Sequence, residues 1–279
     1  MEDQSKKLLE VQKDAWDKSS VGWKKWDSTV MAFLRPMSNE MIQMMNIADD
    51  DNILDVATGT GEPGLTIASM LKNGKVTGTD LSDKMLEVAN ENAVKRGITN
   101  FETICCDVSS LPFKNDTYNA ISCRLGFNLF PDMKLALQEM IRTLKTGGQI
   151  VASVWSTPEK NFWVANSMGT MISRLQLNPP AHGAPGIWRC SQPGFMVDLF
   201  REAGLKNIRE REVAGKLFCE TYETYWNFIT ETVSPVAFFK ADETIKRQIK
   251  EEVIGRVKAK YTNGNISLDS SAIIISGQK

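Results

Sequence analysis

Histidine is almost absent from this sequence: His182 is the only one in 279 residues. A metal site built from several histidines is therefore excluded, and the five cysteines offer no replacement because none forms a Cys-x-x-Cys pair. We expect no metal centre. An odd number of cysteines without paired spacing also argues against a disulfide framework and favours reduced thiols in the cytoplasm.

Long apolar runs and an excess of one charge are missing as well. No window resembles a membrane span, and the polar N-terminus does not resemble a signal peptide. The formal net charge is −1, with 33 basic and 34 acidic residues, so nothing indicates a nucleic-acid partner. These absences favour a small-molecule substrate and leave the oligomeric state open.

Short apolar runs alternate with helical segments through the centre of the chain. We expect strands at 52–57, 75–80, 101–106, 118–123 and 149–155, with helices at 65–71, 83–96 and 133–144 between them. A helix at 193–203 and strands at 207–214 and 271–276 follow. This alternation predicts a doubly wound α/β fold, a mostly parallel seven-stranded sheet with an antiparallel C-terminal strand.

The less regular segments are expected to form a helical cap. Residues 5–35 are typical of one or two helices, with Gly22 as a break and Pro36 as a stop, and a methionine-rich helix follows at 37–48. The predicted division is an N-terminal cap segment (1–48), the cofactor-binding core (49–155), a Pro- and Gly-rich cap insertion without regular structure (156–191), a core helix and strand (192–216), a helical cap insertion (217–262) and a core strand (263–279).

A glycine-rich loop carries the main functional signal. Between the first strand and the next helix the chain reads Asp55-Val56-Ala57-Thr58-Gly59-Thr60-Gly61-Glu62-Pro63-Gly64. Its glycines would let the backbone approach a ligand, and the helix start would offer free N–H groups. The spacing also fits the GxGxxG fingerprint of dinucleotide sites, with Asp80 at the expected distance. However, Asp55 and Glu62 put anions where a dinucleotide places phosphates, so adenosine with a cationic amino-acid tail fits better.

Four segments resemble, in order, the motifs of the class I S-adenosylmethionine-dependent methyltransferases: 53–61, 78–82, 107–118 and 144–148. Together they resemble the ubiquinone/menaquinone-biosynthesis (UbiE-type) branch. The resemblance implies S-adenosylmethionine as cofactor, with Asp80 at the ribose hydroxyls and Asp107 at the adenine amino group. Ala57 replaces the family's first glycine, and 123–128 matches the branch's Gly-Leu-Arg-Asn run only loosely.

The predicted ligand contacts come from the strand ends and from the cap. For the cofactor they are Asp55, Ala57, Thr58, Gly59, Thr60, Gly61, Asp80, Leu81, Met85, Asp107, Val108, Arg124, Trp23 and Trp26. Trp16, Trp23 and Trp26 would close over the sulfonium, because aromatic faces attract cations. For the acceptor they are Phe127, Asn128, Tyr222, Tyr225 and Trp226; helical packing is the alternative reading of the last three.

His182 is the candidate general base, because its ordinary pKa is the nearest to neutrality. The predicted function is methyl transfer from S-adenosylmethionine to a small-molecule acceptor by in-line displacement, mainly through proximity and desolvation. Two alternatives stay open. The first is an NAD(P)-dependent oxidoreductase, although the sequence shows no Tyr-x-x-x-Lys pair for hydride transfer. The second is a regulatory protein that binds the nucleoside without turnover. The acceptor and the methylated atom are not determined by these patterns.

Overall fold

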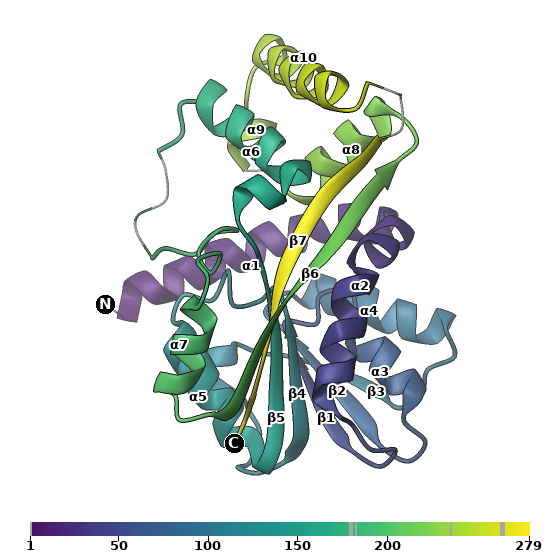
Figure 1. Cartoon of the computed structure of the whole chain (residues 1–279), viewed down its shortest axis with the longest axis vertical. Helices are drawn as coiled ribbons and strands as arrows, with labels where there is room; N and C mark the ends of the chain where they lie inside the picture. The colour runs from purple at the N-terminus through teal and green to yellow at the C-terminus, as the bar shows by residue number, and fades with distance from the viewer. Residues whose placement is uncertain (1, 179–180, 182, 235, 263–265) are drawn as a thin grey trace.

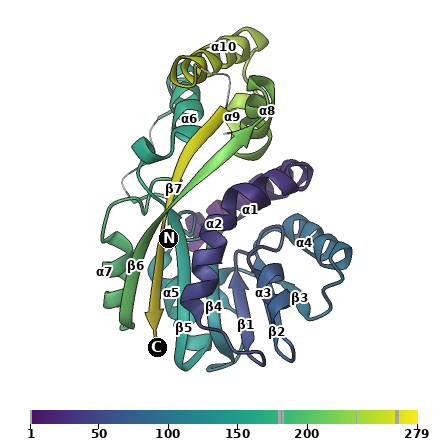
Figure 2. The ribbon, with the colours of Figure 1, turned by 45° about the vertical axis from the view of Figure 1, so that its right-hand side comes forward.

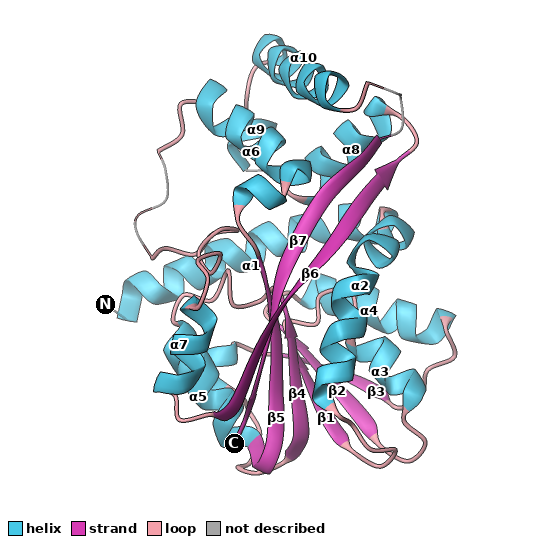
Figure 3. Cartoon of the chain, in the orientation of Figure 1, coloured by secondary structure: helices cyan, strands magenta, loops and turns pink. Residues whose placement is uncertain are grey.

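A computed structural model describes residues 2–178, 181, 183–234, 236–262 and 266–279. In these ranges seven strands form one sheet in the order β3-β2-β1-β4-β5-β7-β6. They are β1 (Asn52–Val56), β2 (Lys75–Asp80), β3 (Phe101–Cys105), β4 (Tyr118–Arg124), β5 (Leu144–Trp155), β6 (Lys206–Cys219) and β7 (Ile266–Gln278). Strands β1 to β5 are parallel, and β7 is antiparallel to β5 and β6 (Figure 3). The predicted fold class is confirmed.

Helices cover both faces of the sheet (Figure 2). On one face lie α2 (Asp27–Met45) and α3 (Gly64–Met70), and on the other lie α5 (Met133–Thr143) and α7 (Phe195–Glu202). Helix α4 (Asp83–Lys95) packs against β2 and β3, and the Ser82 side chain caps its first turn. Strand order reverses between β1 and β4, so the connections that follow them lead to helices on opposite faces, α3 and α5, and leave the crevice in which such folds bind ligands.

The cap is built on a ribbon that extends beyond the sheet. Strand β5 pairs with residues 272–278 of β7, so residues 266–271 pair only with β6. Around this ribbon lie α6 (Phe162–Arg174), α8 (Tyr222–Thr232), α9 (Val236–Phe239) and α10 (Glu243–Lys260), with α1 (Glu2–Lys25) crossing beneath them (Figure 1). Phe33, Trp155, Trp163 and Phe228 make ring contacts in series, so one apolar core continues from the sheet into the cap.

The two expected breaks in the N-terminal helices are wrong. Helix α1 passes through Gly22, where an added Cβ would lie 2.0 Å from the Glu231 carbonyl oxygen of the α8 segment. Gly22 therefore permits a close helix crossing and does not end the helix. Pro36 lies inside α2. An internal proline costs about 3 kcal/mol, and burial of Phe33, Leu34 and Met37 on the same helix offsets this cost.

The cap insertion at 156–191 is more regular than expected. It contains the short helix η2 (Pro158–Lys160) and the whole of α6, whose buried Trp163, Val164 and Met171 recur at helical spacing. Conversely, residues 217–219 belong to β6 and not to the predicted helical segment. Their burial alternates, with Leu217 and Cys219 buried and Phe218 exposed, which is the period of a strand.

Candidate functional site

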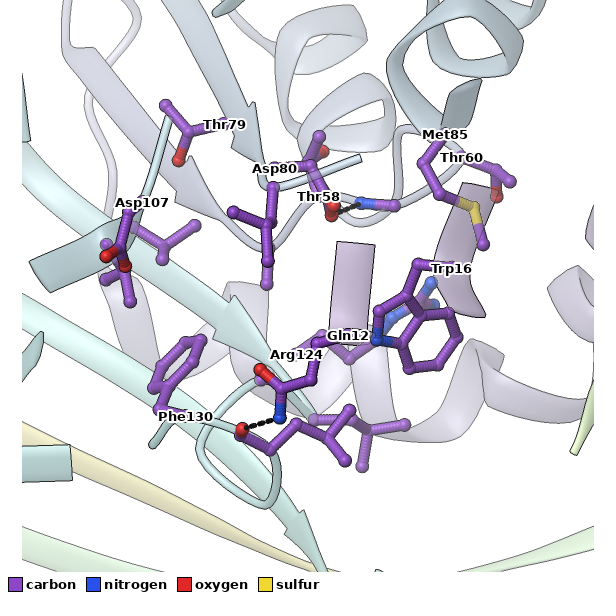
Figure 4. Close-up of a pocket in the computed structure, with 18 of the residues that line it drawn as sticks. Gln12, Trp16, Thr58, Thr60, Thr79, Asp80, Met85, Asp107, Arg124 and Phe130 are labelled. Carbon is purple, nitrogen blue, oxygen red and sulfur yellow. Dashed lines mark hydrogen bonds between the residues drawn. The ribbon is translucent and has the colours of Figure 1, made fainter. Parts of the chain in front are cut away.

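A cavity of about 990 Å³, open mouth included, lies at the carboxyl ends of the parallel strands (Figure 4). In Figure 4, Asp80 and Thr79 lie on one side and Arg124 and Phe130 lie across from them. The lining residues are Leu9, Gln12, Trp16, Trp23, Leu34, Val56, Ala57, Thr58, Gly59, Thr60, Glu62, Thr79, Asp80, Leu81, Met85, Cys106, Asp107, Val108, Arg124, Leu125, Gly126, Leu129, Phe130 and Pro131.

The glycines of the loop after β1 serve different purposes. Gly59 lines the cavity in a left-handed conformation (φ 55°), and a Cβ built there would meet no atom within 4 Å. Gly61 (φ 107°) does not line the cavity, and its Cβ would lie 2.5 Å from Leu65 Cδ1 of α3. Gly59 thus leaves space for a ligand, whereas Gly61 permits packing. Ala57 also has positive φ (55°), where the family has glycine.

Asp55 does not line the cavity; its buried side chain stabilises this loop through hydrogen bonds. Its carboxylate accepts hydrogen bonds from Thr58 Oγ1 at 2.6 Å, from the Gly64 amide at 3.1 Å and from Ser122 Oγ at 2.6 Å. Burial raises the pKa of Asp55 to about 6, and the three hydrogen bonds oppose that rise. The expected contact between Asp55 and a ligand's amino group finds no support here; the side chain organises the loop.

Asp80, at the end of β2, is one of the carboxylates that line the cavity. One oxygen accepts the Gly59 amide at 2.9 Å and the other accepts the Ser82 amide at 2.9 Å. Burial raises its pKa, against these hydrogen bonds. Because each carboxylate oxygen can accept more than one hydrogen bond, both keep capacity for ligand hydroxyl groups.

Three of the amides expected to be free near the start of α3 are already donated. Gly59 donates to Asp80, Gly64 donates to Asp55, and Gly61 donates to the Thr58 carbonyl at 2.9 Å. Glu62, only 4% exposed, adds a carboxylate that is paired with Arg96. A pyrophosphate at this helix start would therefore find these three donors already used and a buried anion beside them. The geometry disfavours a dinucleotide.

The loop after β3 adds Cys106, Asp107 and Val108 to the cavity. The Asp107 carboxylate accepts the Ser109 amide at 2.9 Å and so begins the short helix η1 (Val108–Ser110). Burial raises the pKa of the Cys106 thiol to about 12, which keeps it protonated near neutral pH. Asp107 is thus a fixed hydrogen-bond acceptor, and Cys106 is an apolar neighbour.

Arg124, at the end of β4, brings positive charge to the cavity. Its guanidinium donates to Ser38 Oγ at 3.1 Å and forms no ion pair within 4.0 Å among the described residues. Burial lowers its pKa, while the carboxylates of Glu62 and Asp55 raise it. An arginine stays charged in either case, so its remaining N–H groups could bind a carboxylate.

One face of α1 closes the cavity. Leu9, Gln12, Trp16 and Trp23 recur at intervals of three, four and seven residues and line the cavity together. Asp17 fastens the helix to the start of α4, because its carboxylate accepts the Ser82 hydroxyl at 2.6 Å. Helical spacing was the signal that could have identified Leu9 and Gln12.

Of the three tryptophans proposed to face the ligand, Trp16 and Trp23 line the cavity and Trp26 does not. Trp26 instead donates its indole N–H to Glu231 at 2.7 Å and contacts the Phe228 ring edge-to-face.

Phe127 and Asn128, which were predicted to contact the acceptor, do not line the cavity. Phe127 is fully buried against Phe130 and Phe200, and the Asn128 amide donates to the Ile187 carbonyl at 2.7 Å. The wall after β4 is lined instead by Leu125, Gly126, Leu129, Phe130 and Pro131. The sequence therefore predicted that the loop after β4 lines the cavity, but not which residues of that loop face inward.

The aromatic residues of α8 hold the cap together. The Tyr225 hydroxyl donates to the Trp163 carbonyl at 2.7 Å, Trp226 packs against Phe238, and Tyr222 lies beneath the Lys258 ammonium. None of the three lines the cavity. The candidate base His182 lies outside the described residues.

Neither a metal cluster nor a membrane-spanning helix is found in the part of the chain that the structure describes. No group of three or more His, Cys, Asp and Glu side chains there could hold a metal ion. No helix in the same ranges is both long and apolar enough to cross a bilayer.

Comparisons with known proteins identify similar chains. Residues 47–182 match a family described as a methyltransferase domain. A demethylmenaquinone methyltransferase of Bacillus subtilis (strain 168) is 28% identical over 193 residues, which cover 63% of this chain and 80% of that protein. The structure of YcgJ from Bacillus subtilis has a TM-score of 0.58 at 22% identity, covering 87% of this chain and 97% of that chain.

A second solved structure was determined with a nucleoside ligand bound. It is a Haemonchus contortus phosphoethanolamine N-methyltransferase 2 in complex with phosphomonomethylethanolamine and S-adenosylhomocysteine. Its TM-score is 0.54 at 15% identity, with 87% of this chain and 52% of that chain covered.

Proposed function

We propose that this chain, a class I S-adenosylmethionine-dependent methyltransferase of the UbiE type, methylates a small apolar acceptor. The observation that carries the proposal is that two kinds of surface line the cavity. The ends of β1, β2 and β3 supply hydrogen-bonding groups, which form its polar half, whereas Leu9, Leu129 and Phe130 supply apolar surface. Such a cavity suits one polar, nucleoside-containing ligand beside one apolar molecule.

In this proposal S-adenosylmethionine occupies the polar half. Asp80 accepts the ribose hydroxyls, because the Gly59 and Ser82 amides hold its two oxygens in place. Asp107 accepts the adenine amino group, and Leu81, Met85 and Val108 enclose the ring. Thr58, Gly59 and Thr60 let the backbone approach the ligand, and the Arg124 guanidinium binds the carboxylate of the amino-acid tail. The open space at Gly59 supports this fit.

When bound, the cofactor supplies an electrophilic methyl group on a sulfonium. The chain's own part is to align that ligand with the acceptor and to exclude water. Trp16 and Trp23 would present ring faces to the sulfonium charge, and Leu9 of the same helix would add apolar cover.

Proton removal needs no described side chain in this proposal. Glu62 is paired with Arg96, Asp80 and Asp107 accept backbone amides, and the Cys106 thiol stays protonated. We therefore favour an acceptor that is nucleophilic unaided, such as an acidic phenol, a thiolate or an amine. His182 remains a proposal for an acceptor that needs a base.

Binding and turnover test the proposal in sequence. We expect S-adenosylhomocysteine to bind in calorimetry, and NADH and NADPH not to bind. Transfer from methyl-labelled S-adenosylmethionine is then measured with a reduced demethylmenaquinone analogue, phenols, thiols and amines, and we expect apolar acceptors to be preferred. The demethylmenaquinone analogue is included because the Bacillus subtilis relative is named for that substrate. NADH binding without S-adenosylhomocysteine binding would refute the cofactor. Cofactor binding without turnover on any acceptor would favour a regulatory protein.

A further inference from the structure

The apolar wall of the cavity is the loop between β4 and α5, whose side chains Leu129, Phe130 and Pro131 line the cavity. The backbone carbonyls of this loop accept hydrogen bonds from residues of α1 and of the cap. Gly186 donates its amide to the Asn128 carbonyl at 2.9 Å. Gln12 of α1 donates its side-chain amide to the Leu129 carbonyl at 2.9 Å.

Arg189 holds the next two carbonyls of the loop. One terminal nitrogen donates to the Phe130 carbonyl and the other donates to the Pro131 carbonyl at 3.3 Å. Four consecutive carbonyls, from 128 to 131, therefore accept hydrogen bonds from outside the sheet and its helices. Three of these bonds come from residues 186–189, a segment of the cap.

The Arg189 contact is one that only a guanidinium can make. Its two terminal nitrogens reach neighbouring carbonyls at once, whereas a lysine ammonium is a single point charge. Burial lowers the pKa of Arg189 without neutralising the side chain. Hydrogen bonds from a charged donor are stronger than neutral ones. The Asn128 amide adds a bond in the reverse direction, to the Ile187 carbonyl at 2.7 Å.

The polar half of the cavity does not depend on these contacts. Asp80 is held by the Gly59 and Ser82 amides, and Asp55 is held by Thr58, Gly64 and Ser122. None of those bonds involves residues 183–191. The two halves of the cavity are thus supported by different parts of the chain.

We propose that Arg189 is a positioning residue for the acceptor: by holding the Phe130 and Pro131 carbonyls it sets the apolar wall and leaves the cofactor half unchanged. The inference rests on the proposed function, which gives that wall its role. It places acceptor selection in the contact between residues 186–191 and the loop after β4.

The test compares Arg189→Lys and Arg189→Gln with the control Arg201→Lys. Arg201 lies on α7, is 64% exposed and pairs only with Asp198 among the described residues. Three quantities are measured: amide hydrogen exchange over 125–131, calorimetric affinity for S-adenosylhomocysteine, and calorimetric affinity for 2-naphthol with S-adenosylhomocysteine saturating. 2-Naphthol is the apolar probe.

In both Arg189 variants we expect exchange at 125–131 and the dissociation constant for 2-naphthol each to rise at least about tenfold. Both charge-assisted hydrogen bonds to the wall are weakened or lost, and the loss of one alone corresponds to about a tenfold change. Exchange in β4 and affinity for S-adenosylhomocysteine should stay at wild-type values, and the control should change nothing. Arg189→Lys keeps the positive charge. If it binds 2-naphthol as weakly as Arg189→Gln does, the cause is the loss of the two-pronged guanidinium contact and not the loss of charge.

Several results would overturn the inference. Wild-type exchange at 125–131 in folded Arg189 variants would do so, as would a parallel loss of S-adenosylhomocysteine affinity. Absence of 2-naphthol binding by wild-type protein that binds S-adenosylhomocysteine would remove the apolar wall's role. Failure of the wild-type protein to bind S-adenosylhomocysteine would instead refute the proposed function, while hydrogen exchange would still decide what Arg189 holds.

Discussion

Gly59 and Gly61 lie two residues apart in one loop, yet replacing each by alanine should have a different main consequence: a loss of ligand affinity at Gly59 and a loss of stability at Gly61. At Gly59 (φ 55°) a Cβ meets no atom, so the left-handed conformation, about 1–2 kcal/mol, is the main cost. Alanine also lowers the conformational entropy of the unfolded chain, which stabilises the folded protein by about 0.4–1 kcal/mol. Ala57 shows that an alanine in this loop can adopt the left-handed conformation. We expect Gly59→Ala to lower the free energy of unfolding by about 1 kcal/mol.

Gly61→Ala meets two penalties. Its φ of 107° is sparsely populated for an L-residue, which costs about 1–3 kcal/mol. The new Cβ would also lie 2.5 Å from Leu65 Cδ1, and Leu65 is fully buried, so overpacking adds about 1–3 kcal/mol. We expect the free energy of unfolding to fall by about 4 kcal/mol.

Ligand binding should show the reverse order. The Gly59→Ala methyl group points into the cavity, so we expect S-adenosylhomocysteine affinity to fall at least about tenfold. Urea unfolding and calorimetry measure the two effects. Gly97→Ala is the control, because Gly97 has φ 67° and open space at the end of α4, away from the cavity. Wild-type affinity in Gly59→Ala, or Gly61→Ala as stable as Gly97→Ala, would refute this assignment.

Three further predictions concern single side chains. Asp80→Ala should weaken S-adenosylhomocysteine binding by about 1–3 kcal/mol, measured by calorimetry; unchanged affinity would contradict the ribose contact. Asp55 has a pKa raised from 3.8 to about 6, so the folded protein holds this proton more tightly than the unfolded chain does. As the pH rises from about 4 to 7, the free energy of unfolding of the wild type should therefore fall by about 3 kcal/mol relative to that of Asp55→Asn. A stability difference between the two proteins that does not change with pH in urea unfolding would contradict this prediction. Gly22→Ala should lower the free energy of unfolding by about 1–3 kcal/mol despite alanine's higher helix propensity, because its Cβ meets Glu231. A more stable variant would show that α1 and α8 do not cross this closely.

Local patterns in the sequence determined the sheet and the polar half of the cavity. Strands β1 and β4 are short runs rich in apolar residues, and the ends of all four strands from β1 to β4 could be predicted to within a few residues. The loop from Ala57 to Thr60 and the residue Asp80 belong to neighbouring strands of one parallel sheet. Because parallel strands end on the same edge, their sequence positions were enough to bring them together.

The N-terminal helices and the apolar wall were decided by tertiary contacts. Gly22 and Pro36 are helix breakers by propensity, yet both lie within helices, because packing against α8 and against the sheet outweighs propensity. Gln12 and Leu129 are 117 residues apart, and Asn128 and Ile187 are 59 apart. Neither periodicity nor a motif relates residues at such distances. The orientation of the wall depends on which segments fold back onto it. The sequence was therefore enough to predict the glycine loop and Asp80 at the cavity, but not the side chains of the wall that face inward.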